Sequence, residues 1–349
     1  MSKFRNLGLI VNYTLLNNAR FRLEDYVTGV RSGDRMMLAK AITLAESTLP
    51  EDQSLSAEVI DKILPDTGDS IRIGITGIPG VGKSTFIESL GTHIINDGNK
   101  VAILTIDPSS RLTKGSILGD KTRMEELSKN TNAFIRPTAT GNTLGGVGSK
   151  TREAMLLCEA AGYNVIIIET VGVGQSEVTV KNMVDFFLLL LLAGAGDELQ
   201  GIKKGIMEMA DAVVITKADG DNVKHATEAQ AEYQQAIHLL SSKKSGWTPP
   251  VLTTSAINKI GIEEIWKMIL AYKSKTSASG FFGDNRYTQN INWFHEYFQQ
   301  LLITDPMRFS AFKKKLNDLD QNVADQKISP HQAARQLLDA YHRAIQNNK

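Results

Sequence analysis

The sequence has little of what several protein classes require. Its 349 residues include one cysteine, Cys158, so a disulfide framework within the chain is excluded. We expect Cys158 to be a small buried residue of a protein from a reducing, cytoplasmic compartment. The formal net charge is only +1, which gives no sequence-wide attraction to nucleic acid or to a membrane surface.

Long apolar runs are also missing. The most apolar run, Phe186 to Ala193, is far shorter than the ~20 residues that a membrane-spanning helix needs. The N-terminal residues have no small-residue cleavage site and do not resemble a signal peptide. We therefore expect no membrane partner, and we interpret the run as a central strand of a parallel sheet that is covered on both faces.

Strands alternate with helices between residues 67 and 276. This order predicts an α/β fold with a mostly parallel central sheet flanked by helices. The expected strands are 71–76, 101–106, 133–136, 165–169, 185–192, 212–216 and 251–254. The expected helices are 83–96, 145–161, 200–209, 223–240 and 262–272.

The two flanking regions differ from this pattern. Residues 1–66 are predicted to form a helical extension, with helical periodicity over 20–48 broken at Gly33, a loop at Pro50 and a short helix over 57–64. Residues 277–349 are predicted to form a C-terminal helical arm. It starts with a loop, SKTSASGFFGDNR, and continues as helices over 287–302, 306–316 and 330–346.

The segment GIPGVGKST follows the first strand and opens a helix, which is the context of a phosphate-binding loop. Its glycines let backbone N–H groups approach phosphate oxygens, and the helix adds its positive dipole end. Lys83 would bridge the β- and γ-phosphates and Ser84 would bind Mg²⁺. The predicted nucleotide-binding residues here are Gly77, Ile78, Pro79, Gly80, Val81, Gly82, Lys83, Ser84 and Thr85.

Carboxylates at the carboxyl ends of neighbouring strands are the candidates for holding Mg²⁺. Asp107 and Glu169 follow two strands, and Asp120 lies in a loop that can fold over the site. The plainer alternatives are a helix cap for Asp107 and an edge carboxylate for Glu169. Gly172 is placed to bond the γ-phosphate through its N–H, as in a nucleotide switch. Gln175 is a candidate for orienting the attacking water, although a surface glutamine is an equal alternative.

The choice of base is predicted by the segment Thr216-Lys-Ala-Asp219, which ends a strand. One carboxylate, Asp219, can accept both N1–H and N2–H of guanine, whereas adenine would present a lone pair to it. The stem of Lys217 can cover one face of the base. Threonine replaces the usual asparagine at 216 and can still bond the loop backbone. The next strand end supplies Ser255, Ala256 and Ile257; the alternative is a loop with a capping aspartate.

With these motifs in place, the sequence resembles the MeaB-type GTPases, the methylmalonyl-CoA mutase-associated GTPases also called ArgK. The resemblance covers about residues 35 to 300. It rests on GDRMMLAKAITLAES, GIPGVGKST, IDPSSRLTKGSILGDKTRM, ETVGVGQSE and GAGDELQGIKKGIMEMAD. It implies the dimer-forming class of P-loop GTPases, with Mg²⁺ as cofactor and GTP and GDP as substrate and product. Carried over by motif, Lys83, Glu169 and Gln175 are the catalytic candidates, and Ser84, Asp107, Asp120 and Glu169 surround the metal.

The same resemblance implies a partner, an adenosylcobalamin-dependent acyl-CoA mutase whose cofactor loading, protection or reactivation depends on GTP. It implies a third switch over 193–209 and a homodimer formed through the C-terminal arm. The candidate dimer contacts, for which a core role is a close alternative, are Phe281, Phe282, Trp293, Phe294, Tyr297 and Phe298. Two other functions stay open: a nickel-insertion-like metal-delivery GTPase, and an ATPase or kinase component of a basic amino-acid transport system. Six scattered histidines weigh against the first and Asp219 against the second.

Overall fold

The computed structural model describes residues 21–106, 124–138, 144–170, 176–194, 204–238 and 244–346. Its centre is a seven-stranded sheet with the order β3-β2-β4-β1-β5-β6-β7, and every pairing between these strands is parallel. The strands are β1 (Ile71–Gly77), β2 (Val101–Ile106), β3 (Ala133–Thr138), β4 (Val165–Thr170), β5 (Phe186–Leu192), β6 (Ala212–Thr216) and β7 (Val251–Thr253). The predicted α/β fold is therefore confirmed.

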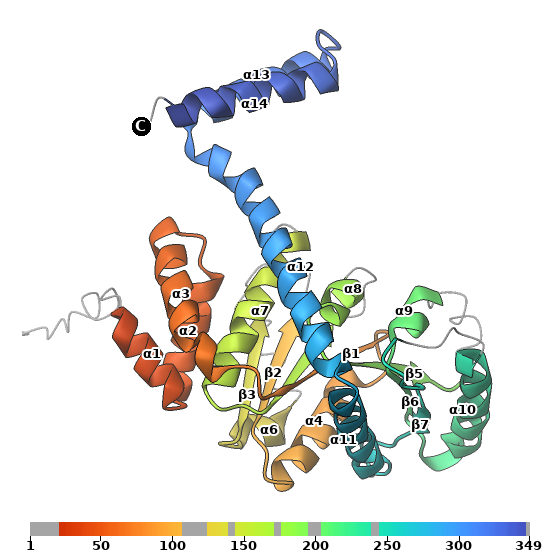
Figure 1. The fold of residues 1–349 in the computed structure, drawn as a ribbon. Helices are drawn as coiled ribbons and strands as arrows, with labels where there is room; N and C mark the ends of the chain where they lie inside the picture. The colour runs from red at the N-terminus through yellow and green to blue at the C-terminus, as the bar shows by residue number, and fades with distance from the viewer. Residues whose placement is uncertain are drawn as a thin grey trace, which may run out of the picture.

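Helices cover both faces of the sheet (Figure 1). Alternate residues of β1, such as Ile73 and Ile75, pack with α4 (Lys83–Asn96) and α11 (Ile262–Ala278) in one core cluster. The opposite face, for example Leu104 of β2, packs with α7 (Leu144–Ala160) in a second cluster. The remaining helices around the sheet are α6 (Glu125–Lys129), α8 (Ser176–Lys181), α9 (Lys204–Met209) and α10 (Val223–His238).

Strand β5 explains the most apolar run of the sequence. It lies between β1 and β6, and Phe186, Leu188 and Leu190 face one core cluster while Phe187 faces another. Burial of each such side chain stabilises the fold by about 1.5–3 kcal/mol. In the part of the chain that the structure describes, no helix combines the length and the apolar character needed to cross a membrane.

The N-terminal helices pack onto the sheet domain through α7. They are α1 (Leu23–Arg31), α2 (Arg35–Glu46) and α3 (Pro50–Ile63), and their apolar residues share one core cluster with α7. The break predicted at Gly33 is present. The loop predicted at Pro50 is wrong, because this proline is the first residue of α3. A proline fits that position, since its missing N–H would have no partner in the first helical turn.

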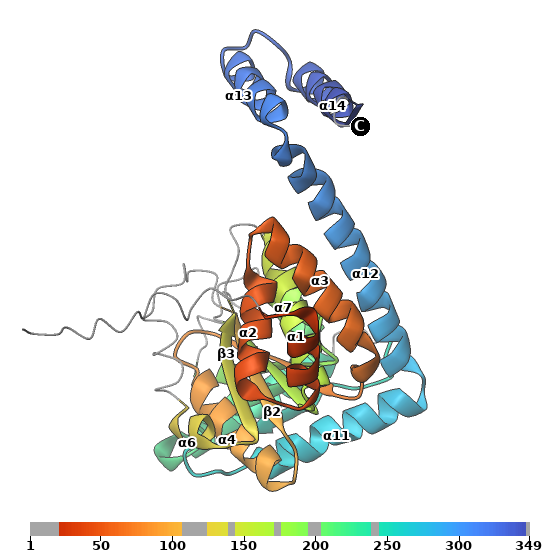
Figure 2. The same cartoon turned by 90° about the vertical axis from the view of Figure 1, so that its left-hand side faces the viewer.

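The C-terminal region leaves the sheet domain as a long helix (Figures 1 and 2). Helix α12 (Phe281–Thr304) carries at its far end a short 3₁₀ turn, η3 (Asp305–Arg308), and the hairpin of α13 (Ser310–Ala324) and α14 (Pro330–Gln346). The predicted loop SKTSASGFFGDNR is wrong. Helix α11 continues to Ala278, and only Ser279 and Gly280 separate it from α12. Gly280, at φ 79°, adopts the left-handed conformation in which this turn reverses.

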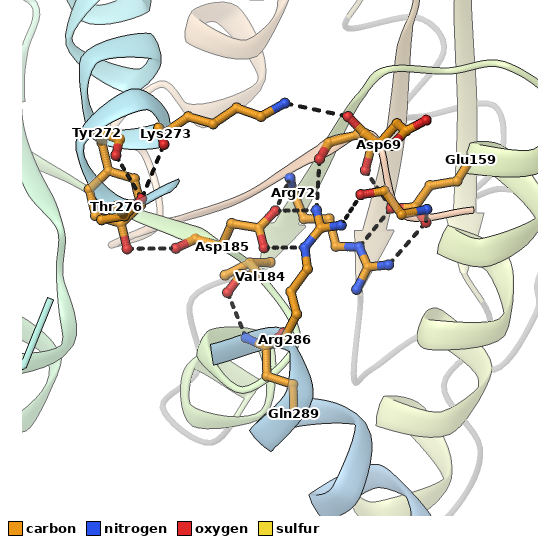
Figure 3. Close-up of polar contacts among 12 residues, drawn as sticks. Asp69, Arg72, Glu159, Val184, Asp185, Tyr272, Lys273, Thr276, Arg286 and Gln289 are labelled. Carbon is orange, nitrogen blue, oxygen red and sulfur yellow. Dashed lines mark hydrogen bonds and ion pairs between the residues drawn. The ribbon is translucent and has the colours of Figure 1, made fainter. Parts of the chain in front are cut away.

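A buried group of polar side chains holds the start of α12 at the amino ends of β1 and β5 (Figure 3). Arg286 forms two bonds of 2.7 Å with the carboxylate of Asp185 and donates to the main-chain oxygen of Ser70. The same carboxylate accepts from the backbone N–H of Arg72 at 2.8 Å. Gln289 donates to the Val184 carbonyl at 2.8 Å. The Arg72 guanidinium donates to both carboxylate oxygens of Glu159, at 2.8 and 3.0 Å. We call Arg72, Glu159, Asp185, Arg286 and Gln289 the root cluster.

Candidate nucleotide site

The predicted phosphate loop runs from the carboxyl end of β1 into the first turn of α4. A Cβ at Gly77 would lie 2.6 Å from the carbonyl oxygen of Leu190, so any larger residue would push the loop away from β5. Gly82, at φ 94°, is the N-cap of α4, and no side chain caps this helix. The N–H groups of the first helical turn therefore point out at the loop, where an anion gains from the helix dipole.

Lys83 lies over this loop. Its Nζ donates to the carbonyl oxygens of Gly77 at 2.8 Å and Ile78 at 3.1 Å. Burial lowers the pKa of Lys83, and the carboxylates of Glu169 and Glu177 oppose that shift. Glu177, which is 3% exposed on α8, was not predicted from the sequence. The available signal was its place in ETVGVGQSE, two residues after Gln175.

The side chains predicted for Mg²⁺ meet beside Lys83, as far as the described residues include them. Ser84 donates its hydroxyl to Glu169 Oε1 at 3.1 Å, and Glu169 is buried at the end of β4. Next to it, the hydroxyls of Thr170 and Thr76 are joined at 2.8 Å across β4 and β1. A hydroxyl and a carboxylate form an oxygen donor set of the kind Mg²⁺ prefers.

The residues predicted to read the base also come together. The Ser255 hydroxyl donates to Asp219 Oδ2, which ties the loop after β7 to the loop after β6. The Ala256 carbonyl accepts from the Ser89 hydroxyl of α4 at 2.7 Å. Lys217, the first residue after β6, has φ 56°, a left-handed conformation uncommon for a lysine. Ile257 is exposed.

Thr216 connects the base side to the phosphate side. Its hydroxyl donates to the Val81 carbonyl of the phosphate loop at 2.7 Å and is 3.2 Å from the Leu191 carbonyl. The predicted bond from this threonine to the loop backbone is therefore present. Because Thr216 is buried, its hydroxyl needs these acceptors, and the bond to Val81 holds the phosphate loop against the ends of β5 and β6.

Four predicted site residues lie outside the described residues: Asp107, Asp120, Gly172 and Gln175. Most of the predicted third switch, residues 195–203, also lies outside them. The described ranges do contain α9, which is the last part of that segment.

A parallel sheet with a glycine loop and lysine at the end of its first strand, and an aspartate loop two strands away, defines the class of this protein: a P-loop GTPase. The family model described as "Methylmalonyl Co-A mutase-associated GTPase MeaB" matches residues 38–309. The chain belongs to this family.

Known proteins from distant organisms are similar to it. A probable GTPase of Mycobacterium tuberculosis is 47% identical over 317 residues, which cover 91% of this chain and 94% of the relative. The mouse protein "Methylmalonic aciduria type A homolog, mitochondrial" is 43% identical over 324 residues, with 90% and 78% covered. Among solved structures, a "LAO/AO transport system kinase" superimposes with a TM-score of 0.70 at 40% identity, covering 91% of this chain and 96% of that one.

Proposed function

We propose that this GTPase is a chaperone for an adenosylcobalamin-dependent acyl-CoA mutase of the methylmalonyl-CoA type. It assists the loading, protection or reactivation of the mutase cofactor. The observation that carries the proposal is the family match over residues 38–309, which includes the phosphate loop, the base loop and the root of the arm. The similarity to the mouse methylmalonic aciduria homolog supports the same partner.

In this proposal the triphosphate lies on the loop between β1 and α4. Its oxygens would accept the hydrogen bonds of the Lys83 ammonium. In the structure the carbonyl oxygens of Gly77 and Ile78 accept these bonds. Ser84 and Glu169 would hold Mg²⁺, with Asp107 and Asp120 as the further predicted ligands. When bound, the ion neutralises charge that develops on the phosphate oxygens.

The base is read by the two loops joined through Ser255 and Asp219. In the structure an oxygen of the Asp219 carboxylate accepts a hydrogen bond from the Ser255 hydroxyl, so this side chain is held in a position to accept from donors. The two adjacent N–H donors of guanine suit that carboxylate. Adenine offers a lone pair at the corresponding atom and would leave a desolvated charge without a donor.

The proposed homodimer uses α12. Its outward face carries Phe294, stacked on Phe298 with ring centroids 6.4 Å apart, and Leu302 beyond them. All three side chains are at least half exposed. A contiguous apolar strip of this kind on a helix that leaves the domain is typical of a protein–protein contact.

The test is a pull-down from a cell extract of the source organism. The tagged protein is loaded with a non-hydrolysed GTP analogue in one sample and with GDP in the other, and the Lys83→Ala variant serves as control. We expect a cobalamin-dependent acyl-CoA mutase to co-purify in a nucleotide-dependent manner. Its absence from every sample, with nucleotide binding intact, would contradict the proposed partner.

Metal delivery is less well supported as a second function. Within the described residues, no group of three or more His, Cys, Asp or Glu side chains could hold a metal ion. A transport-system ATPase or kinase, as in the name of the superimposed structure, predicts binding of ATP. Competition against labelled GDP separates these functions, because the base-reading argument requires GTP to displace the label far better than ATP.

A further inference from the structure

A pocket of about 230 Å³ lies among three helices from different parts of the chain. Helices α3 and α12 both pack on α7 (Figure 2). Residues of all three helices line the pocket. Its lining includes none of the residues assigned to the phosphates, the metal or the base. Whatever it binds is therefore distinct from GTP.

One wall of the pocket is aromatic. Trp293 and Tyr297, about one helical turn apart on α12, line it together with Phe294. The Arg152 guanidinium already lies over the Trp293 ring, 5.9 Å from the centroid, so this part of α12 accepts a cation. Aromatic faces carry negative charge density and attract organic cations.

The lining residues of α7 and α3 supply negative charge. Glu153 of α7 is 12% exposed, and its only ionic partner among the described residues is Lys150, at 3.3 Å. Burial raises the pKa of Glu153, and Lys150 lowers it by less, so the carboxylate is only partly compensated. Asp61 of α3 adds a second carboxylate at the exposed side of the pocket. Among the lining residues the two carboxylates outnumber the single lysine, and the nearby Arg152 is not part of the lining and is already paired with Glu296. An anion would therefore meet both carboxylates.

We propose that this pocket binds a small organic cation, a protonated amine on an apolar or aromatic body. The ammonium lies beside Glu153, and the body lies against Trp293 and Tyr297. A neutral molecule of the same shape would make only the apolar contacts. An anion would be attracted by Lys150 but repelled by the carboxylates of Glu153 and Asp61. The geometry thus selects by charge first and by shape second.

The experiment compares three molecules of matched shape: 2-phenylethylamine, 2-phenylethanol and 3-phenylpropionate. Binding is measured by calorimetry at neutral pH, and the site is identified by the indole N–H resonance that Trp293→Phe removes. We expect the amine to bind at least about tenfold more tightly than the other two and to shift this resonance. Equal affinities, or a shift of the Trp247 or Trp266 resonance alone, would overturn the proposal.

Variants then test the carboxylates. Glu153→Gln is expected to weaken the amine at least about tenfold, and Asp61→Asn about threefold, because Asp61 is exposed to solvent. Glu58→Gln, an exposed carboxylate of α3 outside the pocket, is the matched control and leaves the affinity unchanged. GDP affinity, measured on each variant, reports that the fold is intact. If Glu153→Gln and Asp61→Asn both bind the amine as the native chain does, the assignment fails.

Discussion

Two groups of buried polar side chains lie at opposite ends of the same strands. They differ in whether the cation that they contain is paired with a carboxylate. At the amino ends, Arg286 is held by the carboxylate of Asp185, and although burial lowers its pKa, the Asp185 bonds and charge raise it overall. At the carboxyl ends, Lys83 is bonded to neutral carbonyls, and burial lowers its pKa. A cation that is fully paired stabilises the fold, whereas one that is underpaired has affinity left for a ligand.

The largest expected effect on stability is at the amino ends. Arg286→Met leaves the Asp185 carboxylate, 1% exposed, without its ionic partner. Loss of one member of a buried ion pair costs about 3–5 kcal/mol of unfolding free energy, measured by urea denaturation. GTP hydrolysis per folded molecule should change less than about threefold. The control is Arg308→Met on the same arm, where an exposed pair with Asp305 contributes at most about 1 kcal/mol. Equal losses of unfolding free energy in the two variants would show that the Arg286 ion pair stabilises the fold no more than an exposed pair does.

At the carboxyl ends the expected effect is on rate. Lys83→Ala should lower the single-turnover rate of GTP hydrolysis by about 10²–10³, because a preorganised charge on the phosphates is lost. Its thermal unfolding midpoint should stay near that of the native chain. Lys267→Ala, which removes an exposed lysine of α11, is the control for charge. A large drop in the midpoint of Lys83→Ala, with a normal rate, would reverse the comparison.

Base recognition comes next. Asp219→Asn should weaken GDP binding at least about 100-fold and shift preference towards xanthine nucleotides, because an amide can donate to the oxygen that xanthine carries. Equilibrium competition with a labelled nucleotide measures the change. Asp221→Asn, on an exposed aspartate two residues further, is the matched control. Unchanged guanine affinity in Asp219→Asn would place the base contact elsewhere.

The smallest effect is expected at Thr216, which lies between the strand and the loop. Thr216→Val keeps the shape but leaves the Val81 and Leu191 carbonyls without this donor, which costs about 1–3 kcal/mol. We expect lower stability to urea and faster release of GDP. Thr227→Val removes an exposed hydroxyl that bonds its own helix and should change neither quantity. Thr216→Asn, which restores the usual residue, tests whether an amide can make the same bond.

The parts of the fold that the sequence predicted correctly depend on local signals. Apolar strands and the spacing of Gly77, Gly82 and Lys83 are visible within a few residues, so β1, β2, β6 and α4 were predicted with the observed bounds or within one residue of them. The junction of α11 and α12 was predicted as a loop because SASGFFG has loop composition. In the folded chain the contacts of α12 with the sheet domain overrule that preference.

The root cluster was not predicted, and the reason is sequence distance. Arg72 and Glu159 are 87 positions apart, and Arg286 and Asp185 are 101 apart. Ion pairs across such distances leave no periodicity or motif in the chain. At the candidate nucleotide site, Lys83, Ser84 and Asp219 were predicted because each belongs to a motif with fixed spacing. Glu177 was not predicted, because its motif was considered only as far as Gln175.

Helix α12 is 24 residues long, which corresponds to about 36 Å. Its bonds to the sheet domain run from Arg286 and Gln289 near one end to Glu296, which pairs with Arg152 of α7 at 2.5 Å, and the α13–α14 hairpin is carried at the other end. A tilt of about 10° at the bonded end would therefore displace the hairpin by ~6 Å. Small adjustments of the root-cluster side chains would therefore change the position of the α13–α14 hairpin.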